Sequence, residues 1–192
     1  MVKTFWFDMD GVLAIYERNA YIKNYKQGEC IEKTPIYLQP EKHYYRTVQP
    51  DVKMIEVVKL LQYKSAHSVR IITNVSPDEL IRPIQVEDKL DWLHKYCPFI
   101  TTEQFFWTTS TKSERVLEIT KNQLITDCVN LKLDTSQILI DDFNKNLLNW
   151  QNAGGTAIKY INGLNDPKSF NGIIIPDYIT DSFTIAKSLS DL

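Results

Sequence analysis

Residues Phe5 to Leu13 read Phe-Trp-Phe-Asp-Met-Asp-Gly-Val-Leu, and no other part of the chain constrains the structure as strongly. The first three residues form a short apolar run, which is typical of a buried strand. Asp8 and Asp10 follow at once and can point the same way, because side chains on an extended chain alternate between faces. Gly11 then permits a sharp turn. Two acids at the end of a buried strand are costly unless they hold a cation or do chemistry; the alternative is an acidic turn that merely caps the strand.

The overall composition is that of an ordinary globular protein. The chain has 192 residues, of which 43% are hydrophobic and 24% are charged, and this length suffices for one domain with a sizeable core. The formal net charge is -2 and no long basic block is present, so nothing favours binding to a nucleic-acid polymer. The three cysteines form no CxxC motif, which argues against a zinc site and favours reduced thiols in a cytosol.

The sequence also predicts a cytoplasmic protein. The first expected strand begins within a few residues of Met1, which leaves no room for a signal peptide. No apolar stretch approaches the length needed to span a membrane. We therefore expect neither secretion nor a membrane partner.

Apolar runs of strand length alternate with segments of helical spacing along most of the chain. This alternation predicts a Rossmann-like α/β fold, in which a mostly parallel sheet carries helices on both faces. In addition, Ser76-Pro77-Asp78-Glu79 has the composition of a helix start, and Pro83 is expected to interrupt that helix soon afterwards. The expected strands are residues 3–7, 68–73, 105–108, 137–140, 156–161 and 173–175, and the expected helices are residues 52–63, 86–96, a long helix within 110–131, 144–151 and 182–189.

Residues 14–50 differ from the rest of the chain in composition and in hydrophobic pattern. They are rich in Tyr, Lys, Glu and Gln, contain three prolines and show poor hydrophobic periodicity. A segment of this length is too long for a plain loop, so we expect a small cap inserted after the first strand. Residues 1–13 and 51–192 would then form the α/β core, with the cap folded over the carboxyl edge of the sheet.

Polar residues follow three of the expected strands at the point where each strand ends. Right-handed crossovers bring the carboxyl ends of parallel strands to one edge, where open α/β sheets bind their ligands. Three separate clusters at the same edge indicate a functional site more strongly than any one of them alone. The residues expected there are Asp8, Asp10, Thr73, Asn74, Asp141 and Asp142.

Four carboxylates around one point would repel one another strongly, so this edge predicts a divalent cation. Hard oxygen ligands suit Mg²⁺. A metal-bound carboxylate stays ionised and can attack phosphorus to form an aspartyl-phosphate, while an acid two residues further on can protonate the leaving oxygen and then activate water. The charge on the phosphoryl oxygens needs a hydroxyl or amide donor and a cation, which Thr73, Asn74 and a lysine can supply.

The order Asp-x-Asp-Gly, Thr at a strand end, Lys and then Asp-Asp resembles the haloacid dehalogenase (HAD) superfamily of phosphohydrolases over nearly the whole chain. By this resemblance Asp8 is the nucleophile, Asp10 is the acid/base and Thr73 matches the phosphate-binding Ser or Thr. Asp141 and Asp142 match the acidic metal motif, and Asp142 rather than Asp141 is expected to bind the metal directly. Asp8 and the backbone carbonyl of Asp10 would complete the protein ligands of Mg²⁺.

The same resemblance places the catalytic lysine. Lys112 opens the helix expected after the third strand, where the family usually has this residue. Lys89 and Lys121 are rivals, and we interpret both as surface charges. Lys145, just after the acidic motif, is interpreted as solvated.

Several short matches within the superfamily are similar to the 5'(3')-deoxyribonucleotidases. Asp-Met-Asp-Gly-Val-Leu-Ala matches their opening. Tyr44, Tyr45 and Arg46 resemble the paired-aromatic segment that lines their nucleotide pocket, and Tyr16 falls where that family has an aromatic residue near the base. The full helix expected within residues 110–131 is a departure, because the corresponding segment of those nucleotidases is short.

These patterns together predict a Mg²⁺-dependent phosphomonoester hydrolase whose favoured substrate is a nucleoside monophosphate. A phosphatase of another small metabolite such as a sugar phosphate is the first alternative, and a phosphotransferase is a second. A non-catalytic module that binds a phosphorylated ligand or a protein partner is a third, although the presence of both leading aspartates argues against it. The residues expected to contact substrate are Asn74, Tyr16, Tyr44, Tyr45 and Arg46.

Overall fold

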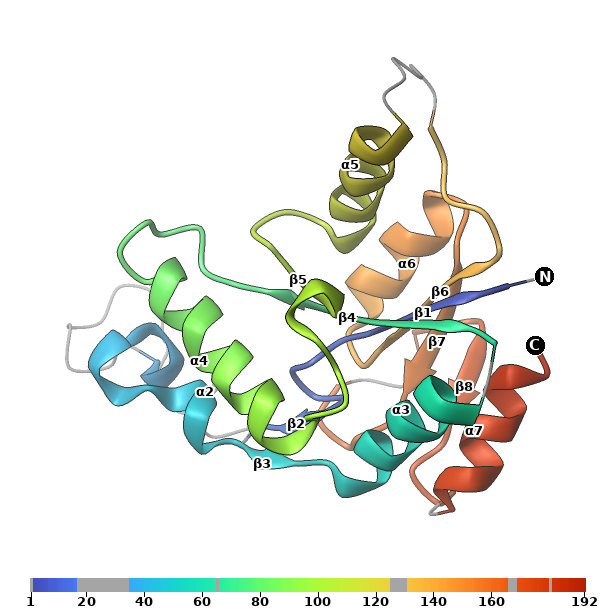
Figure 1. The fold of residues 1–192 in the computed structure, drawn as a ribbon, viewed down its shortest axis with the longest axis horizontal. Coiled ribbons are helices and arrows are strands. Elements are labelled where there is room, and N and C mark those ends of the chain that lie inside the picture. The colour runs from blue at the N-terminus through green and yellow to red at the C-terminus, as the bar shows by residue number, and fades with distance from the viewer. Residues whose placement is uncertain (1, 17–34, 65, 125–130, 166–168, 180) are drawn as a thin grey trace.

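The computed structural model describes residues 2–16, 35–64, 66–124, 131–165, 169–179 and 181–192 (Figure 1). Its frame is a six-stranded sheet in the order β5-β4-β1-β6-β7-β8, in which every neighbouring pair is parallel. This arrangement confirms the predicted Rossmann-like α/β fold. The strands are β1 (Thr4–Phe7), β4 (Ser68–Asn74), β5 (Phe105–Thr108), β6 (Gln137–Asp141), β7 (Thr156–Tyr160) and β8 (Ile173–Ile175).

Helices cover both faces of the sheet, as expected (Figure 1). On β1, Phe5 and Phe7 belong to the core on one face, whereas Trp6 belongs to the core on the other, because successive side chains on a strand alternate. The first face packs against α3 (Val52–Lys64), α4 (Arg82–Tyr96) and α7 (Ser182–Ser190), and the second packs against α5 (Lys112–Leu124) and α6 (Asn144–Asn152).

The predicted helix start at Ser76 is wrong. Helix α4 begins at Arg82, and Pro83 lies in its first turn instead of interrupting an earlier helix. Proline is tolerated there because the first N–H groups of a helix have no partner within the helix. The side chain of Asp78 instead accepts a hydrogen bond of 2.8 Å from the N–H of Leu80, which closes a turn before the helix.

Part of the predicted cap lies within the described residues. It contains β2 (Ala14–Ile15), two short 3₁₀ helices, η2 (Ile36–Leu38) and η3 (Pro40–Lys42), then α2 (Tyr44–Thr47) and β3 (Gln49–Pro50), which pairs antiparallel with β2. Residues 35–50 pack on α4, where Trp92 Nε1 donates to the carbonyl of Val48 at 2.7 Å and Gln85 Nε2 donates to the carbonyl of Tyr37 at 2.8 Å. The division into core and cap stays a prediction, and residues 17–34 lie outside the described part.

No helix in the described ranges is long and apolar enough to cross a membrane. Cys97 is a buried free thiol, whereas Cys30 and Cys128 fall outside the described residues. The cytoplasmic location expected from the sequence stays a prediction.

Candidate active site

Asp8 lies directly after β1, at the carboxyl edge of the sheet, and is almost fully buried. Its Oδ1 accepts a hydrogen bond of 2.7 Å from the N–H of Met9 and is 2.6 Å from Lys112 Nζ. The side-chain contacts of Asp8 with described residues all use Oδ1, so Oδ2 is the oxygen that can approach a ligand. Burial raises the pKa of Asp8 well above its ordinary value, although Lys112 acts in the opposite direction.

Gly11 allows the loop after β1 to touch the loop after β6. Its φ of +83° is unfavourable for other residues, and a Cβ atom at this position would lie only 2.3 Å from Asp142 Oδ2. Asn162 ties the two loops together, since its Nδ2 donates to the Gly11 carbonyl at 2.7 Å and to Asp142 Oδ2 at 2.6 Å. The Asp-x-Asp-Gly motif therefore requires glycine for packing as well as for the turn.

Asp141 ends β6 and is completely buried. Its Oδ1 accepts from the N–H of Phe143 at 2.7 Å, and its Oδ2 accepts from Asn146 Nδ2 at 2.9 Å and from Lys112 Nζ at 2.6 Å. Both oxygens are thus used by the protein, which suits a residue that holds the loop and the lysine in place.

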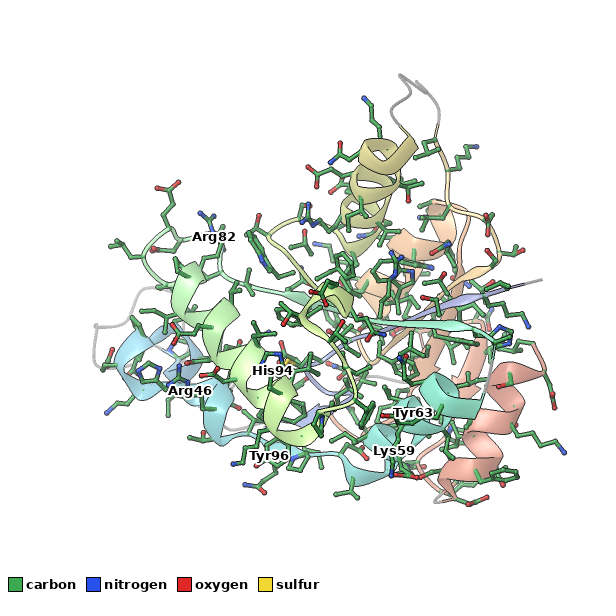
Figure 2. All side chains as sticks on the ribbon, in the orientation of Figure 1. Arg46, Lys59, Tyr63, Arg82, His94 and Tyr96 are labelled. Carbon is green, nitrogen blue, oxygen red and sulfur yellow. The ribbon has the colours of Figure 1, made fainter. Side chains whose placement is uncertain are left out.

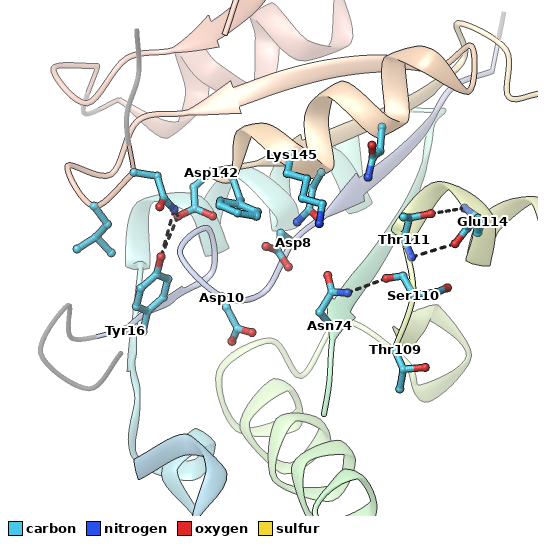
Figure 3. A pocket seen from close by; sticks show the side chains of 15 residues that line it. Asp8, Asp10, Tyr16, Asn74, Thr109, Ser110, Thr111, Glu114, Asp142 and Lys145 are labelled. Atoms are coloured by element: carbon cyan, nitrogen blue, oxygen red, sulfur yellow. Dashed lines mark hydrogen bonds between the residues drawn. The ribbon is translucent and has the colours of Figure 1, made fainter. Parts of the chain in front are cut away.

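Asp142 follows Asp141 directly, and its side chain lines the cavity of the site (Figure 3). Its Oδ2 accepts hydrogen bonds from Asn162 and Asn165 at 2.6 Å each and from the Tyr16 hydroxyl at 3.3 Å. Burial and the nearby charge of Asp141 raise the pKa of Asp142 to about 6. The hydrogen-bond partners of Asp142 among the described residues all bind Oδ2, which leaves Oδ1 as the oxygen that can ligate a cation.

Asp8, Asp141 and Asp142 each offer one carboxylate oxygen within 4.8 Å of the others. A buried group of carboxylates has the chemistry of a site for a hard divalent cation, so the residues present fit Mg²⁺. Asp142 keeps Oδ1 for it, whereas both oxygens of Asp141 are used by the protein, which supports Asp142 over Asp141 as the direct ligand. Asp8 stays a predicted ligand. The side chain of Asp10 does not belong to this group among the described residues, and its backbone carbonyl stays the predicted ligand.

Lys112 occupies the position expected for the catalytic lysine. It opens α5, is 2% exposed, and its Nζ lies between Asp8 and Asp141 at 2.6 Å from each. Burial acts to lower the pKa of Lys112, but attraction to Asp141 and Asp8 outweighs it and raises the pKa above its ordinary value. Lys112 therefore stays a cation beside the carboxylate of Asp8.

The interpretation of Lys89 as a surface charge is wrong. Lys89 is 0% exposed, and its Nζ donates to Asp10 Oδ2 at 2.5 Å, to Thr73 Oγ1 at 2.7 Å and to the Asn74 carbonyl at 2.8 Å. The site thus holds two buried lysines, one beside each leading aspartate. The other rival, Lys121, is exposed as expected, and Lys145 is exposed but lines the cavity of the site.

The side chains of Thr73 and Asn74 diverge at the end of β4. Thr73 is fully buried, and its hydroxyl accepts from Lys89 and lies 3.4 Å from Asp10 Oδ2. Asn74 instead lines the cavity and donates to the Ser110 carbonyl at 2.9 Å (Figure 3). Thr73 therefore contacts the acid/base candidate, whereas Asn74 faces the cavity.

A cavity of about 710 Å³ opens over the acidic group. Asp8, Asp10 and Asp142 face it at the sheet edge, and Tyr16 borders it (Figure 3). The asparagines around the acidic loop were not predicted, because Asn is common in ordinary surface loops. The remaining residues that line the cavity are Asn74, Thr109, Ser110, Thr111, Glu114, Phe143, Lys145, Asn146, Asn149, Leu164 and Asn165.

The four side chains predicted to line a nucleotide pocket lie in two different places. Tyr16 lines the cavity, whereas none of the described residues that line it comes from α2, which carries Tyr44, Tyr45 and Arg46. The Tyr45 ring lies against Lys89, with Nζ 4.2 Å from the ring centroid. Tyr44 is buried in the core beside it.

Arg46 lies between α2 and α4 (Figure 2), where acids of α4 hold it. Its guanidinium forms ion pairs with Glu87 at 3.0 Å, Asp88 at 2.7 Å and Asp91 at 2.9 Å. These contacts fix α2 to α4 and give Arg46 a structural role. Its predicted contact with substrate stays a prediction.

No family model and no curated protein sequence matches the chain. Solved structures do match it over nearly its full length. A hydrolase from Pseudomonas syringae superposes with a TM-score of 0.62 at 13% identity, covering 100% of this chain and 99% of that one. A HAD family hydrolase from Deinococcus radiodurans, with bound phosphate and sodium, gives a TM-score of 0.60 at 13% identity, covering 99% and 96%.

A D,D-heptose 1,7-bisphosphate phosphatase from B. bronchiseptica, complexed with magnesium and phosphate, gives a TM-score of 0.59 at 14% identity and covers 99% of each chain. At this identity the likeness shows the fold, which is the α/β fold of HAD-superfamily hydrolases. The resemblance noted in the sequence is confirmed at that level, whereas the likeness to 5'(3')-deoxyribonucleotidases is not confirmed.

Proposed function

We propose that this protein is a Mg²⁺-dependent phosphomonoester hydrolase that works through an aspartyl-phosphate on Asp8. The observation that carries the proposal is the arrangement of Asp8 itself. One of its oxygens is fixed by the Met9 N–H and by Lys112, while the other remains to face the acidic cavity. The structural neighbours solved with magnesium or phosphate support the same chemistry.

In the first step, Asp8 Oδ2 attacks phosphorus and the bond from phosphorus to the leaving oxygen breaks. Asp10 gives its proton to that oxygen, and its contacts with Lys89 and Thr73 all use Oδ2, so Oδ1 remains for this transfer. In the second step, Asp10 takes a proton from water, and the resulting hydroxide attacks phosphorus. The bond to Asp8 breaks and inorganic phosphate is released.

Asp8, Asp142 and the Asp10 carbonyl would hold Mg²⁺, which would offset negative charge on the carboxylates and on the phosphoryl oxygens. Lys112 neutralises the nucleophile and Asp141 in a site shielded from water. Asn74 is placed to donate to a phosphoryl oxygen, since its side chain lines the cavity.

Removal of the metal is expected to abolish phosphate release. Activity should vanish with a chelator and return when Mg²⁺ is restored, because the carboxylate group would otherwise repel the phosphate dianion. Asp142→Asn should raise the Mg²⁺ concentration for half-maximal rate by roughly tenfold or more, since it removes a charged ligand. A phosphate-release assay over a Mg²⁺ series measures both effects.

The exposed Asp191 supplies a matched control, and Asp191→Asn should leave the Mg²⁺ requirement unchanged. Normal turnover by a metal-stripped protein would rule out the proposed role of the carboxylates.

The favoured substrate remains a nucleoside monophosphate, on the basis of the short sequence matches and of Tyr16 at the cavity. A sugar phosphate is the second candidate, favoured by the structural similarity to the heptose bisphosphate phosphatase. A panel of phosphomonoesters assayed with Mg²⁺ distinguishes them, because the true substrate should have the highest kcat/KM.

Tyr45→Ala is expected to slow the hydrolysis of nucleotides and of small alkyl phosphates by the same factor, about tenfold. The Tyr45 ring contacts Lys89 and is absent from the described cavity lining, so its loss acts on the catalytic groups through a cation–π contact of about 2 kcal/mol. Rates on a nucleoside monophosphate and on a small alkyl phosphate without a base, such as glycerol phosphate, measure this. A rise in KM confined to the nucleotide would instead assign Tyr45 to base stacking.

A further inference from the structure

Lys159 is a third buried lysine near the acidic loop, and the mechanism above does not use it. It is the last residue but one of β7, is 1% exposed, and is paired in register with Asp141 of the neighbouring strand. An ammonium group inside a parallel sheet is costly unless strong acceptors surround it.

The acceptors of Lys159 belong to the loop that carries the metal candidates. Its Nζ donates to the backbone carbonyl of Asp142 at 2.6 Å and to Asn144 Oδ1 at 2.6 Å. The first contact holds the backbone of Asp142, while Asn162 and Asn165 hold its carboxylate. Asn144 begins α6, so the second contact ties the start of that helix to β7.

We propose that Lys159 is a positioning residue for Mg²⁺, which acts by holding the turn from Asp142 to Asn144 in the shape that directs Asp142 Oδ1 at the cation. This inference rests on the proposed function, since it concerns the same metal. Groups that hydrogen-bond to a metal ligand fix its orientation, and their removal typically lowers the metal affinity by about 10-fold to 100-fold.

A second role for Lys159 makes the opposite prediction. If the lysine served only to balance the negative charge of the carboxylates, its removal would leave them more negative and Mg²⁺ would bind more tightly. If the lysine positions the loop, its removal should weaken Mg²⁺ binding. The sign of the change in affinity therefore separates the two roles.

The test is calorimetric titration of Mg²⁺ into the protein without substrate, for wild type and for Lys159→Met. We expect the dissociation constant for Mg²⁺ to rise by roughly tenfold in the variant, with KM for substrate near the wild-type value once Mg²⁺ is saturating. Lys187→Met, which changes an exposed lysine of α7, should match wild type. An unchanged or tighter dissociation constant in a folded Lys159→Met protein would overturn the proposal.

Asn144→Ala gives an independent measurement if Lys159→Met fails to fold. It keeps the charge of Lys159 and removes the acceptor that Asn144 offers it, so Mg²⁺ should bind several-fold more weakly. Wild-type Mg²⁺ affinity in Asn144→Ala would contradict the positioning role. Failure of the proposed function would look different, because wild type itself would then show no Mg²⁺-dependent release of phosphate.

Discussion

Asp8→Asn is expected to reduce phosphatase turnover by roughly 10³-fold or more while leaving the fold intact. The amide is nearly the same size as the carboxylate and its oxygen can still accept from the Met9 N–H, but it cannot attack phosphorus as an anion. Phosphate release at saturating Mg²⁺ measures the loss, and thermal unfolding followed by circular dichroism checks the fold.

Asp51→Asn is the matched control for this change. Asp51 is a partly buried carboxylate outside the site that accepts hydrogen bonds from the Met54 N–H and the Tyr160 hydroxyl. Its conversion to the amide should leave turnover near the wild-type value. Wild-type turnover by a folded Asp8→Asn protein would eliminate Asp8 as the nucleophile.

Lys89→Met is expected to reduce turnover by roughly 10²-fold or more. The ammonium group binds Asp10, Thr73 and the carbonyl at the end of β4, so its loss leaves the acid/base candidate without its fixed partner. The loss should be greater for alkyl phosphates than for p-nitrophenyl phosphate, because a good leaving group needs less help from a general acid. Steady-state kinetics on the two substrates measure the difference.

Lys121→Met is the matched control for Lys89→Met. The sequence gives Lys89 and Lys121 the same interpretation, yet Lys121 is exposed on α5. Turnover in Lys121→Met should stay close to wild type. Equal losses on both substrates in Lys89→Met would show a general structural defect and would remove its assigned role beside Asp10.

The strands and the acidic residues at their ends could be predicted because both are local signals. A short apolar run such as Phe5 to Phe7 indicates a buried strand, and a carboxylate placed directly after it must lie at the sheet edge in a parallel α/β fold. The predicted positions of Asp8, Asp141 and Asp142 depend only on these rules, and the structure brings the three together.

The burial of Lys89 depends on packing between distant segments, so it is hard to predict from the sequence. One signal was available, since Lys89 is spaced three and four residues before Trp92 and Leu93, on the buried face of α4. Because buried lysine is rare in general, the sequence favours a surface charge despite this spacing. The partners that make burial tolerable, Asp10 and Thr73, come from other strands and are not visible locally.

The surroundings of Arg46 could not be predicted for a similar reason. A short likeness to a nucleotide-binding segment suggested a substrate contact, whereas Glu87, Asp88 and Asp91 of α4 form the ion pairs. These acids are spaced to share one face of the helix, but nothing in the sequence indicates which basic residue lies opposite them.

The stereochemical course of the reaction at phosphorus tests the covalent mechanism most directly. The substrate is a phosphomonoester made chiral at phosphorus with oxygen isotopes, and the acceptor is an alcohol, so that the product remains chiral. Attack by Asp8 followed by attack of the acceptor involves two in-line displacements, each of which inverts the configuration. We predict net retention of configuration. Net inversion would show a single direct displacement and would contradict an aspartyl-phosphate on Asp8.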